Sequence, residues 1–107
     1  MALEEKFISI ILSILSRPGM YLVNKVEDIE FICMGYQFAA FNYFNDKEID
    51  KLIFDFKLFV NKWAETDVET NWSKIIRFHS STDISSIKLF SNLFEEYILT
   101  KGYKIPK

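Results

Sequence analysis

Apolar residues at the start of the chain recur at helical spacing. Leu3, Phe7, Ile11 and Ile14 share one helical face, while Glu5 and three serines fall on another. Because a helix turns once every 3.6 residues, this pattern predicts an amphipathic helix whose apolar face packs on a core.

The flanks of this segment are not those of a signal peptide. Glu4 and Glu5 stand where a signal peptide carries positive charge, and Arg17-Pro18 replaces the small residues of a cleavage site. The apolar run over residues 7–15 is also too short to cross a bilayer. We therefore expect no membrane partner.

A second helix is predicted from the capping pattern of Asn24 and Glu27 to about Phe44. This segment is apolar almost all round, which is typical of a helix at the centre of a bundle. Gly35 and Ala39 would let a neighbouring helix approach closely.

A third helix is predicted from the repeated capping pattern of Asn45 and Glu48 to about Ala64. Its apolar positions follow the helical period and form a stripe that we expect to be buried. The stripe comprises Ile49, Leu52, Ile53, Phe56, Val60 and Trp63.

Two further helices complete the pattern. Residues 72–76 mark a short fourth helix, although a strand over residues 74–79 would suit its β-branched and aromatic residues equally well. Thr82 or Ser81 caps a fifth helix, which Gly102 ends in the position of a C′ residue. The apolar positions of the fifth helix are Ile84, Ile87, Phe90, Phe94 and Tyr97.

These elements predict an all-α, single-domain bundle of about five helices with a central apolar helix, covering residues 1–107. Composition agrees, because half of the residues are hydrophobic and 17% are aromatic, which is enough to build one core at this length. The net charge of −2 argues against direct nucleic-acid binding, which usually needs a basic surface.

Residue types that commonly carry catalysis are scarce. His79 and Cys33 are the only histidine and cysteine, they belong to different predicted helices, and they cannot supply a structural zinc site. The paired acids at 27–28 and 95–96 are typical of solvated helix faces. We therefore expect no enzyme activity, metal or cofactor, and the lone thiol indicates a reducing cytoplasm.

The first two predicted helices are separated by Arg17-Pro18-Gly19-Met20-Tyr21. Pro18 fixes its own φ and moves Arg17 out of the helical region, while Gly19 can adopt the positive φ of a sharp reversal. The motif therefore predicts a helix stop followed by a tight turn.

The same five residues resemble a motif of the ATPase domain of the gyrase B subunit and its relatives, where a helix with Asn and acids holds magnesium and ATP. Residues 31–41 contain no acid or Asn, and Asn42 lacks the flanking acids that magnesium requires. The glycine motifs that cradle phosphate are also missing. We therefore reject a nucleotide site.

A second resemblance extends over nearly the whole chain. Its pieces are residues 17–21, the Gly-Tyr-x-x-Ala step at 35–39, the aromatic segment at 59–63, the Trp-x-x-Ile-Ile segment at 72–76 and the aromatic segment at 90–97. In this order they resemble a family of small bacterial immunity proteins encoded beside polymorphic or contact-dependent growth inhibition toxins. The resemblance implies a helical protein that neutralises a cognate toxin C-terminal domain, with a nuclease as the expected toxin, by occluding its active site or substrate surface.

Acids in two segments are the candidate toxin-binding residues, because nucleases present cationic clefts that acidic surfaces can occupy and approach rapidly. The first segment, residues 65–70, is a connector between helices, and the second, residues 46–50, is an acidic turn. These acids are Glu65, Asp67, Glu69, Asp46, Glu48 and Asp50. The alternative is that they are ordinary loop and helix N-terminal acids, which the helix dipole favours.

An adaptor that homodimerises through aromatic faces is the alternative function. We expect most large aromatic residues to lie in the core and some to exceed its needs and act as interface anchors. The candidates for this role are Tyr21, Tyr36, Tyr43, Phe44, Trp63, Trp72 and Tyr103. An immunity protein is expected to be a monomer or a weak dimer when free.

Overall fold

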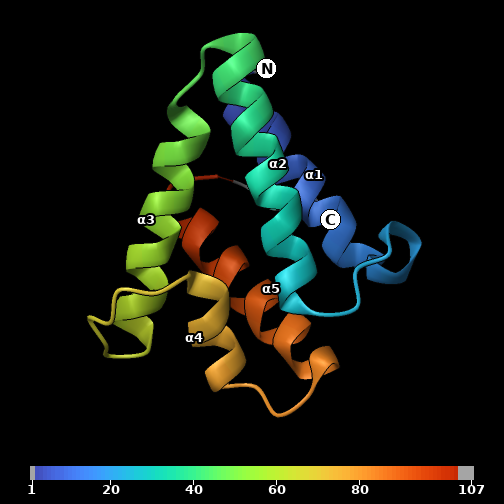
Figure 1. Cartoon of the computed structure of the whole chain (residues 1–107), viewed down its shortest axis with the longest axis vertical. Helices are drawn as coiled ribbons and strands as arrows, with labels where there is room; N and C mark the ends of the chain where they lie inside the picture. The colour runs from blue at the N-terminus through green and yellow to red at the C-terminus, as the bar shows by residue number, and fades with distance from the viewer. Residues whose placement is uncertain (1, 104–107) are drawn as a thin grey trace.

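A computed structural model describes residues 2–103. Its helices are α1 (Leu3–Ser16), α2 (Val26–Phe44), α3 (Glu48–Trp63), α4 (Trp72–Phe78) and α5 (Asp83–Thr100), with a 3₁₀ turn, η1 (Pro18–Tyr21), after α1. Figure 1 shows α2 and α3 joined at one end of the molecule, α1 behind α2, and α4 and α5 at the opposite end. The predicted all-α, single-domain bundle of about five helices is confirmed.

Phe56 of α3 lies in the centre of the core. Its ring is 1% exposed, and edge contacts at centroid distances of 5.4–5.6 Å join it to the rings of Trp72, Phe90, Phe94 and Tyr97. These contacts tie α3 to α4 and α5, because edge-to-face pairs match the positive rim of one ring to the negative face of another.

The predicted apolar faces of the first and third helices are confirmed in most positions. Phe7, Ile11 and Ile14 of α1 are buried, and so is every predicted stripe residue of α3 except Trp63, which is 41% exposed. Residues 72–78 form a helix, so the alternative of a strand over 74–79 is wrong.

The predicted central position of the second helix is wrong. α2 contacts α3, α4 and α5, but it buries only Val26, Ile29, Cys33 and Ala40. Gly35 is exposed, and a Cβ built there would meet no atom within 4 Å, so no neighbour approaches closely at this glycine. The other side of α2 remains open because five helices offer too few neighbours to surround it.

Two of the predicted helix caps are wrong. Asp28, not Glu27, closes the start of α2, because its Oδ2 accepts hydrogen bonds from the backbone N–H groups of Asn24 (2.9 Å) and Lys25 (3.3 Å). Asn45 ends α2 in the left-handed conformation (φ 50°) instead of capping α3.

The predicted caps of the fifth helix are confirmed. Thr82 Oγ1 accepts from the Ser85 N–H at 3.0 Å, and the Ser85 hydroxyl accepts from the Thr82 N–H at 2.9 Å. Gly102 follows the C-cap with a φ of +88°, as expected of a C′ glycine.

The turn after α1 is built differently from the expected one. Pro18 opens η1, but Gly19 does not have a positive φ, and Leu22 takes the left-handed conformation instead (φ 60°, ψ 31°). The Leu22 N–H donates to the Gly19 carbonyl at 3.2 Å, and the Val23 N–H donates to the Pro18 carbonyl at 2.9 Å. The prediction of a positive φ at Gly19 is therefore wrong, because the chain reverses three residues later.

Candidate functional site

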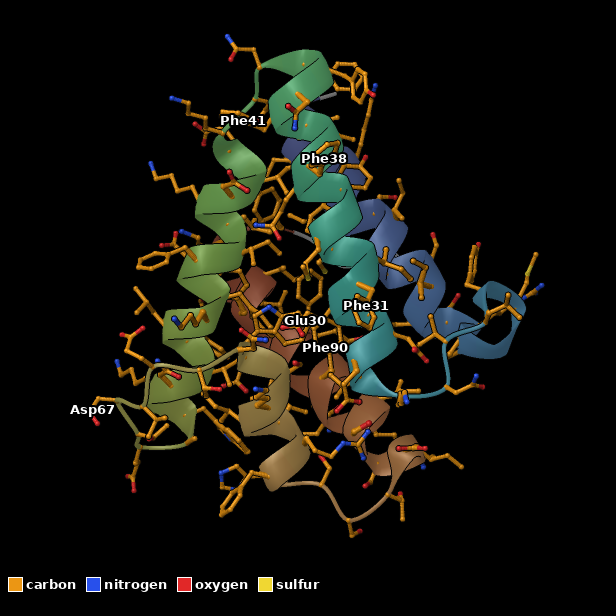
Figure 2. All side chains as sticks on the ribbon, viewed as in Figure 1. Glu30, Phe31, Phe38, Phe41, Asp67 and Phe90 are labelled. Carbon is orange, nitrogen blue, oxygen red and sulfur yellow. The ribbon has the colours of Figure 1, made fainter. Side chains whose placement is uncertain are left out.

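The two acidic segments lie at opposite ends of α3. Asp46 precedes α3 and Glu48 and Asp50 lie in its first turn, whereas the connector acids follow its last turn, so most of this 16-residue helix of about 24 Å separates the two segments. Asp67 lies at the tip of the connector in Figure 2. The six predicted acids therefore form two separate surfaces.

The acids at the start of α3 are partly engaged within the protein. Asp46 Oδ1 accepts from the Glu48 N–H at 2.7 Å, and Asp50 Oδ1 accepts from Gln37 Nε2 at 2.9 Å. These bonds begin α3 and link it to α2, so Asp46 and Asp50 have an evident structural role.

The connector acids are exposed. Glu65 adopts a φ of 54°, which ends α3 and turns the chain away from it. Glu69 makes an ion pair with Lys57 Nζ at 3.2 Å, but its side chain is 90% exposed, so the pair stabilises the fold little. Glu65 and Asp67 make no side-chain ion pair among residues 2–103. They are the acids best placed to meet a partner.

Beside the connector lies an apolar hollow of about 400 Å³. We term it the connector hollow. It is lined by Ala64, Thr66, Val68, Thr70, Lys74, Ile75, Phe78 and His79. Phe78 is 85% exposed, and Trp63 packs against the His79 ring at a centroid distance of 5.0 Å. The hollow therefore places the exposed Phe78 beside the connector, whose acids alternate in sequence with the lining residues Thr66, Val68 and Thr70.

Phe78 was not among the predicted anchors, because it lies three residues after the buried Ile75, and this spacing predicts the same core-facing side of α4. Of the anchors that were predicted, four are exposed, namely Tyr21, Tyr43, Phe44 and Trp63. Trp72 is buried in the core, and Tyr36 packs on Phe7 at a centroid distance of 5.0 Å. Tyr103 is also partly buried against the core.

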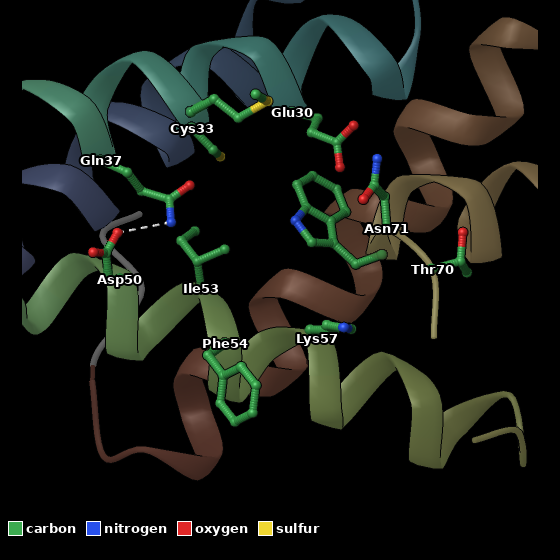
Figure 3. Close-up of a pocket in the computed structure, with 11 residues that line it drawn as sticks. Glu30, Cys33, Gln37, Asp50, Ile53, Phe54, Lys57, Thr70 and Asn71 are labelled. Carbon is green, nitrogen blue, oxygen red and sulfur yellow. Dashed lines mark hydrogen bonds between the residues drawn. The ribbon is translucent and has the colours of Figure 1, made fainter. Parts of the chain in front are cut away.

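A second crevice of about 410 Å³ runs between α2, α3 and the start of α4 (Figure 3). Ser73 Oγ donates to Glu30 Oε1 at 2.8 Å, and the Gln37–Asp50 hydrogen bond crosses the other end. Cys33 lies in this crevice, where burial and the charge of Glu30 raise its thiol pKa to about 12. The thiol is therefore unreactive at neutral pH.

Arg77 of α4 joins three helices through carboxylates. Its Nε and Nη2 donate to Glu27 at 3.0 and 2.7 Å, and Nη2 also donates to Asp83 at 2.9 Å. The hydrogen bond from Arg77 holds the pKa of Glu27 below its usual range. Ser86 of α5 adds a buried contact, because its Oγ accepts from the Val26 N–H at 3.1 Å. Glu27 and Asp83 therefore position α2 and α5.

Cys33 and His79 do not come together, since Cys33 lines the α2–α3 crevice and His79 lines the connector hollow. Within residues 2–103, no group of three or more His, Cys, Asp or Glu side chains is arranged to hold a metal ion. The described helices also include none long and apolar enough to cross a membrane.

The Arg17–Tyr21 motif forms an exposed turn on the surface of the protein. No residue of η1 is buried, and Met20 and Leu22 are 70% and 83% exposed. Pro18 and Gly19 line a hollow of about 430 Å³ with Ile84 of α5. The motif therefore ends α1 as predicted, and it also presents apolar side chains to solvent.

Comparison with known proteins gives no relative, because no protein-family model, curated protein or solved structure matches the chain.

Proposed function

We propose that this protein is an immunity protein that binds and neutralises a cognate bacterial toxin domain, with a nuclease as the expected toxin. The sequence motif at Arg17–Tyr21 and the order of the segments after it motivate the proposal. The observation that carries the choice of surface is the exposed Phe78 on the connector hollow beside Glu65 and Asp67.

An exposed aromatic ring beside a hollow suits a binding anchor. Aromatic residues dominate the energy of many interfaces because a single ring removes a large apolar area from water when a partner covers it. Phe78 and Val68 both line the connector hollow and are exposed in the free protein. A partner that covers them gains affinity chiefly through slower dissociation.

The connector acids supply the complementary charge. A nuclease binds the phosphate backbone with basic side chains, so its cleft attracts Glu65 and Asp67 over distances of about a Debye length. Acids that occupy this cleft compete directly with nucleic acid. Inhibition by occlusion therefore requires no catalytic group on the immunity protein.

Charge reversal at the connector tests this assignment kinetically. The Glu65→Lys and Asp67→Lys double variant should associate with the toxin domain at least about tenfold more slowly below 0.1 M salt, and the difference should shrink at higher salt. Folding should be unchanged, because both side chains lie at exposed positions without ion pairs in the described chain.

The matched control is Glu95→Lys with Glu96→Lys on α5, which changes the net charge equally at another surface. Phe78→Ala should instead raise the dissociation rate at least about tenfold and leave association nearly unchanged. If the connector and α5 variants associate equally fast, the connector is not the toxin surface. Slower association of the α5 variant alone would place that surface on α5.

A further inference from the structure

α2 carries an exposed apolar stripe on the side that the core does not cover. The stripe comprises Phe31, Met34, Phe38 and Phe41, which are 69%, 55%, 65% and 50% exposed. Their spacing of three, four and three residues places them along one face of the helix. Figure 2 shows Phe31, Phe38 and Phe41 spread along the length of α2.

The surface around this α2 stripe can be covered without burying a charge from its own segment. Residues 31–45 include no charged side chain. Gly35 lies next to the stripe on the helix surface, and the space over its Cα is open for 4 Å. A second helix can therefore approach α2 closely at its middle.

The apolar area is sufficient for weak self-association. A phenylalanine buries roughly 150–250 Å² when a partner covers it fully. The stripe residues are half to two-thirds exposed, and Phe54 lies beside Met34 at the same crevice. Together these side chains offer an apolar area on the order of 500 Å². Two copies together would bury about 1,000 Å², which is the lower limit for a specific interface. A patch of this size is at the upper end of the largest apolar patch on a typical monomer, about 300–600 Å², and such patches often serve as binding sites.

We propose that a second copy of this chain covers the α2 stripe in a two-fold symmetric dimer with the two α2 helices antiparallel. A two-fold axis lets one patch complement itself, and stripes at heptad spacing suit helix-to-helix packing. With the axis near residue 36, Phe31 packs on the partner's Phe41, and Met34 packs on the partner's Phe38.

The antiparallel direction follows from the distribution of charge along α2. Glu27, Asp28 and Glu30 all lie in its first turns, and the remainder of the helix is uncharged. Parallel packing would bring these acids of both copies together, where Asp28 and Glu30, which make no ion pair among residues 2–103, would repel their counterparts. Antiparallel packing separates them by most of the length of the helix.

The dimer does not rest on toxin binding, because the connector hollow is lined by residues 64–79 and none of them belongs to α2. Failure of one proposal therefore leaves the other standing. The assembly concerns the free protein and uses no residue assigned to the toxin surface.

Sedimentation over a dilution series tests the dimer. The wild-type chain should approach twice its 12.7 kDa mass with a micromolar dissociation constant. Phe38→Glu should raise this constant at least about 100-fold, since each dimer loses two apolar contacts and gains two buried charges. Tyr43→Glu is the matched control, because Tyr43 is 77% exposed on the same helix but about 140° around it from Phe38.

Cross-linking of engineered cysteines tests the direction of packing. Gly35→Cys lies about 3 Å along the axis from its symmetry mate and should cross-link, whereas Asn42→Cys lies about 18 Å from its mate and should not. The native Cys33 does not interfere, since it is 2% exposed. Efficient cross-linking at Asn42→Cys would overturn the antiparallel arrangement.

Three results would overturn the dimer itself. The first is a wild-type chain that stays monomeric up to about 0.5 mM, well above the micromolar range. The second is equal weakening by Phe38→Glu and Tyr43→Glu. The third is a wild-type chain that is monomeric and whose Phe38→Glu variant loses toxin binding. That result would show that the toxin, and not a second copy, covers the α2 stripe. Both variants replace exposed side chains, so circular dichroism should show native helix content.

Discussion

Replacing Leu22 with glycine should stabilise the protein. Leu22 holds a φ of 60° at the end of η1, and 83% of the residue is exposed. The left-handed conformation costs an L-residue about 1–2 kcal/mol because Cβ crowds the carbonyl oxygen, and glycine avoids that cost. The exposed side chain contributes little apolar burial in return.

The expected gain is smaller than the strain, because glycine also makes the unfolded chain more flexible, at a cost of about 0.4–1 kcal/mol. The net free energy of unfolding should therefore rise by about 0.5–1 kcal/mol, which corresponds to a melting temperature about 2–8 °C higher. Urea unfolding followed by circular dichroism, together with a thermal melt, measures both quantities.

Gly19→Ala is the control, because Gly19 has no positive φ and its Cβ would meet no atom within 4 Å. This variant should be neutral or up to about 1 kcal/mol more stable. The reasoning is refuted if Leu22→Gly lowers stability while Gly19→Ala costs more than about 1 kcal/mol, since that result would place the reversal at Gly19.

Three other predictions concern the core, the Arg77 contacts and the thiol. Phe56→Ala should cost about 3–5 kcal/mol in urea unfolding, because it removes the ring that four others contact; a loss below about 1 kcal/mol would contradict this core. Glu27→Gln should cost about 1 kcal/mol at neutral pH. Since Arg77 lowers the folded pKa of Glu27, that loss should fade as pH falls from the ordinary value of 4.5 through the folded pKa, and a pH-independent loss would contradict it. Cys33 should react with a thiol reagent only after unfolding, and rapid labelling of the native protein would refute its burial.

The buried side of a helix could be predicted where the helix carries a single apolar stripe, because its polar positions indicate the side that faces water. Phe7 and Ile11 in α1, and Leu52 and Phe56 in α3, are buried as the periodicity predicted. In α2 apolar residues occur on all sides of the helix, so the sequence pattern does not indicate which of them are buried against other helices. Their burial depends on how many helices the whole chain can place around α2.

In the turn and in the candidate site, too, some features were predictable from the sequence and others depend on the folded structure. Pro18 predicted the end of α1, but the choice between Gly19 and Leu22 for the left-handed position depends on hydrogen bonds that form only in the folded turn. The acids of the connector were found from their alternation in sequence. Phe78 could not be identified in this way, because its spacing from the buried residues of α4 predicts burial, whereas the residue is exposed.

Binding to a toxin C-terminal domain is the measurement that tests the proposed function most directly, and we expect the gene for that domain to lie beside the gene for this chain. The purified chain should form a complex with that C-terminal domain and abolish its nuclease activity at one equivalent of this chain per toxin domain. The Glu65→Lys and Asp67→Lys variant should reach the same inhibition more slowly, because its folding is intact and only its approach is impaired. Absence of any complex at micromolar concentrations, with full nuclease activity retained, would contradict the function as an immunity protein.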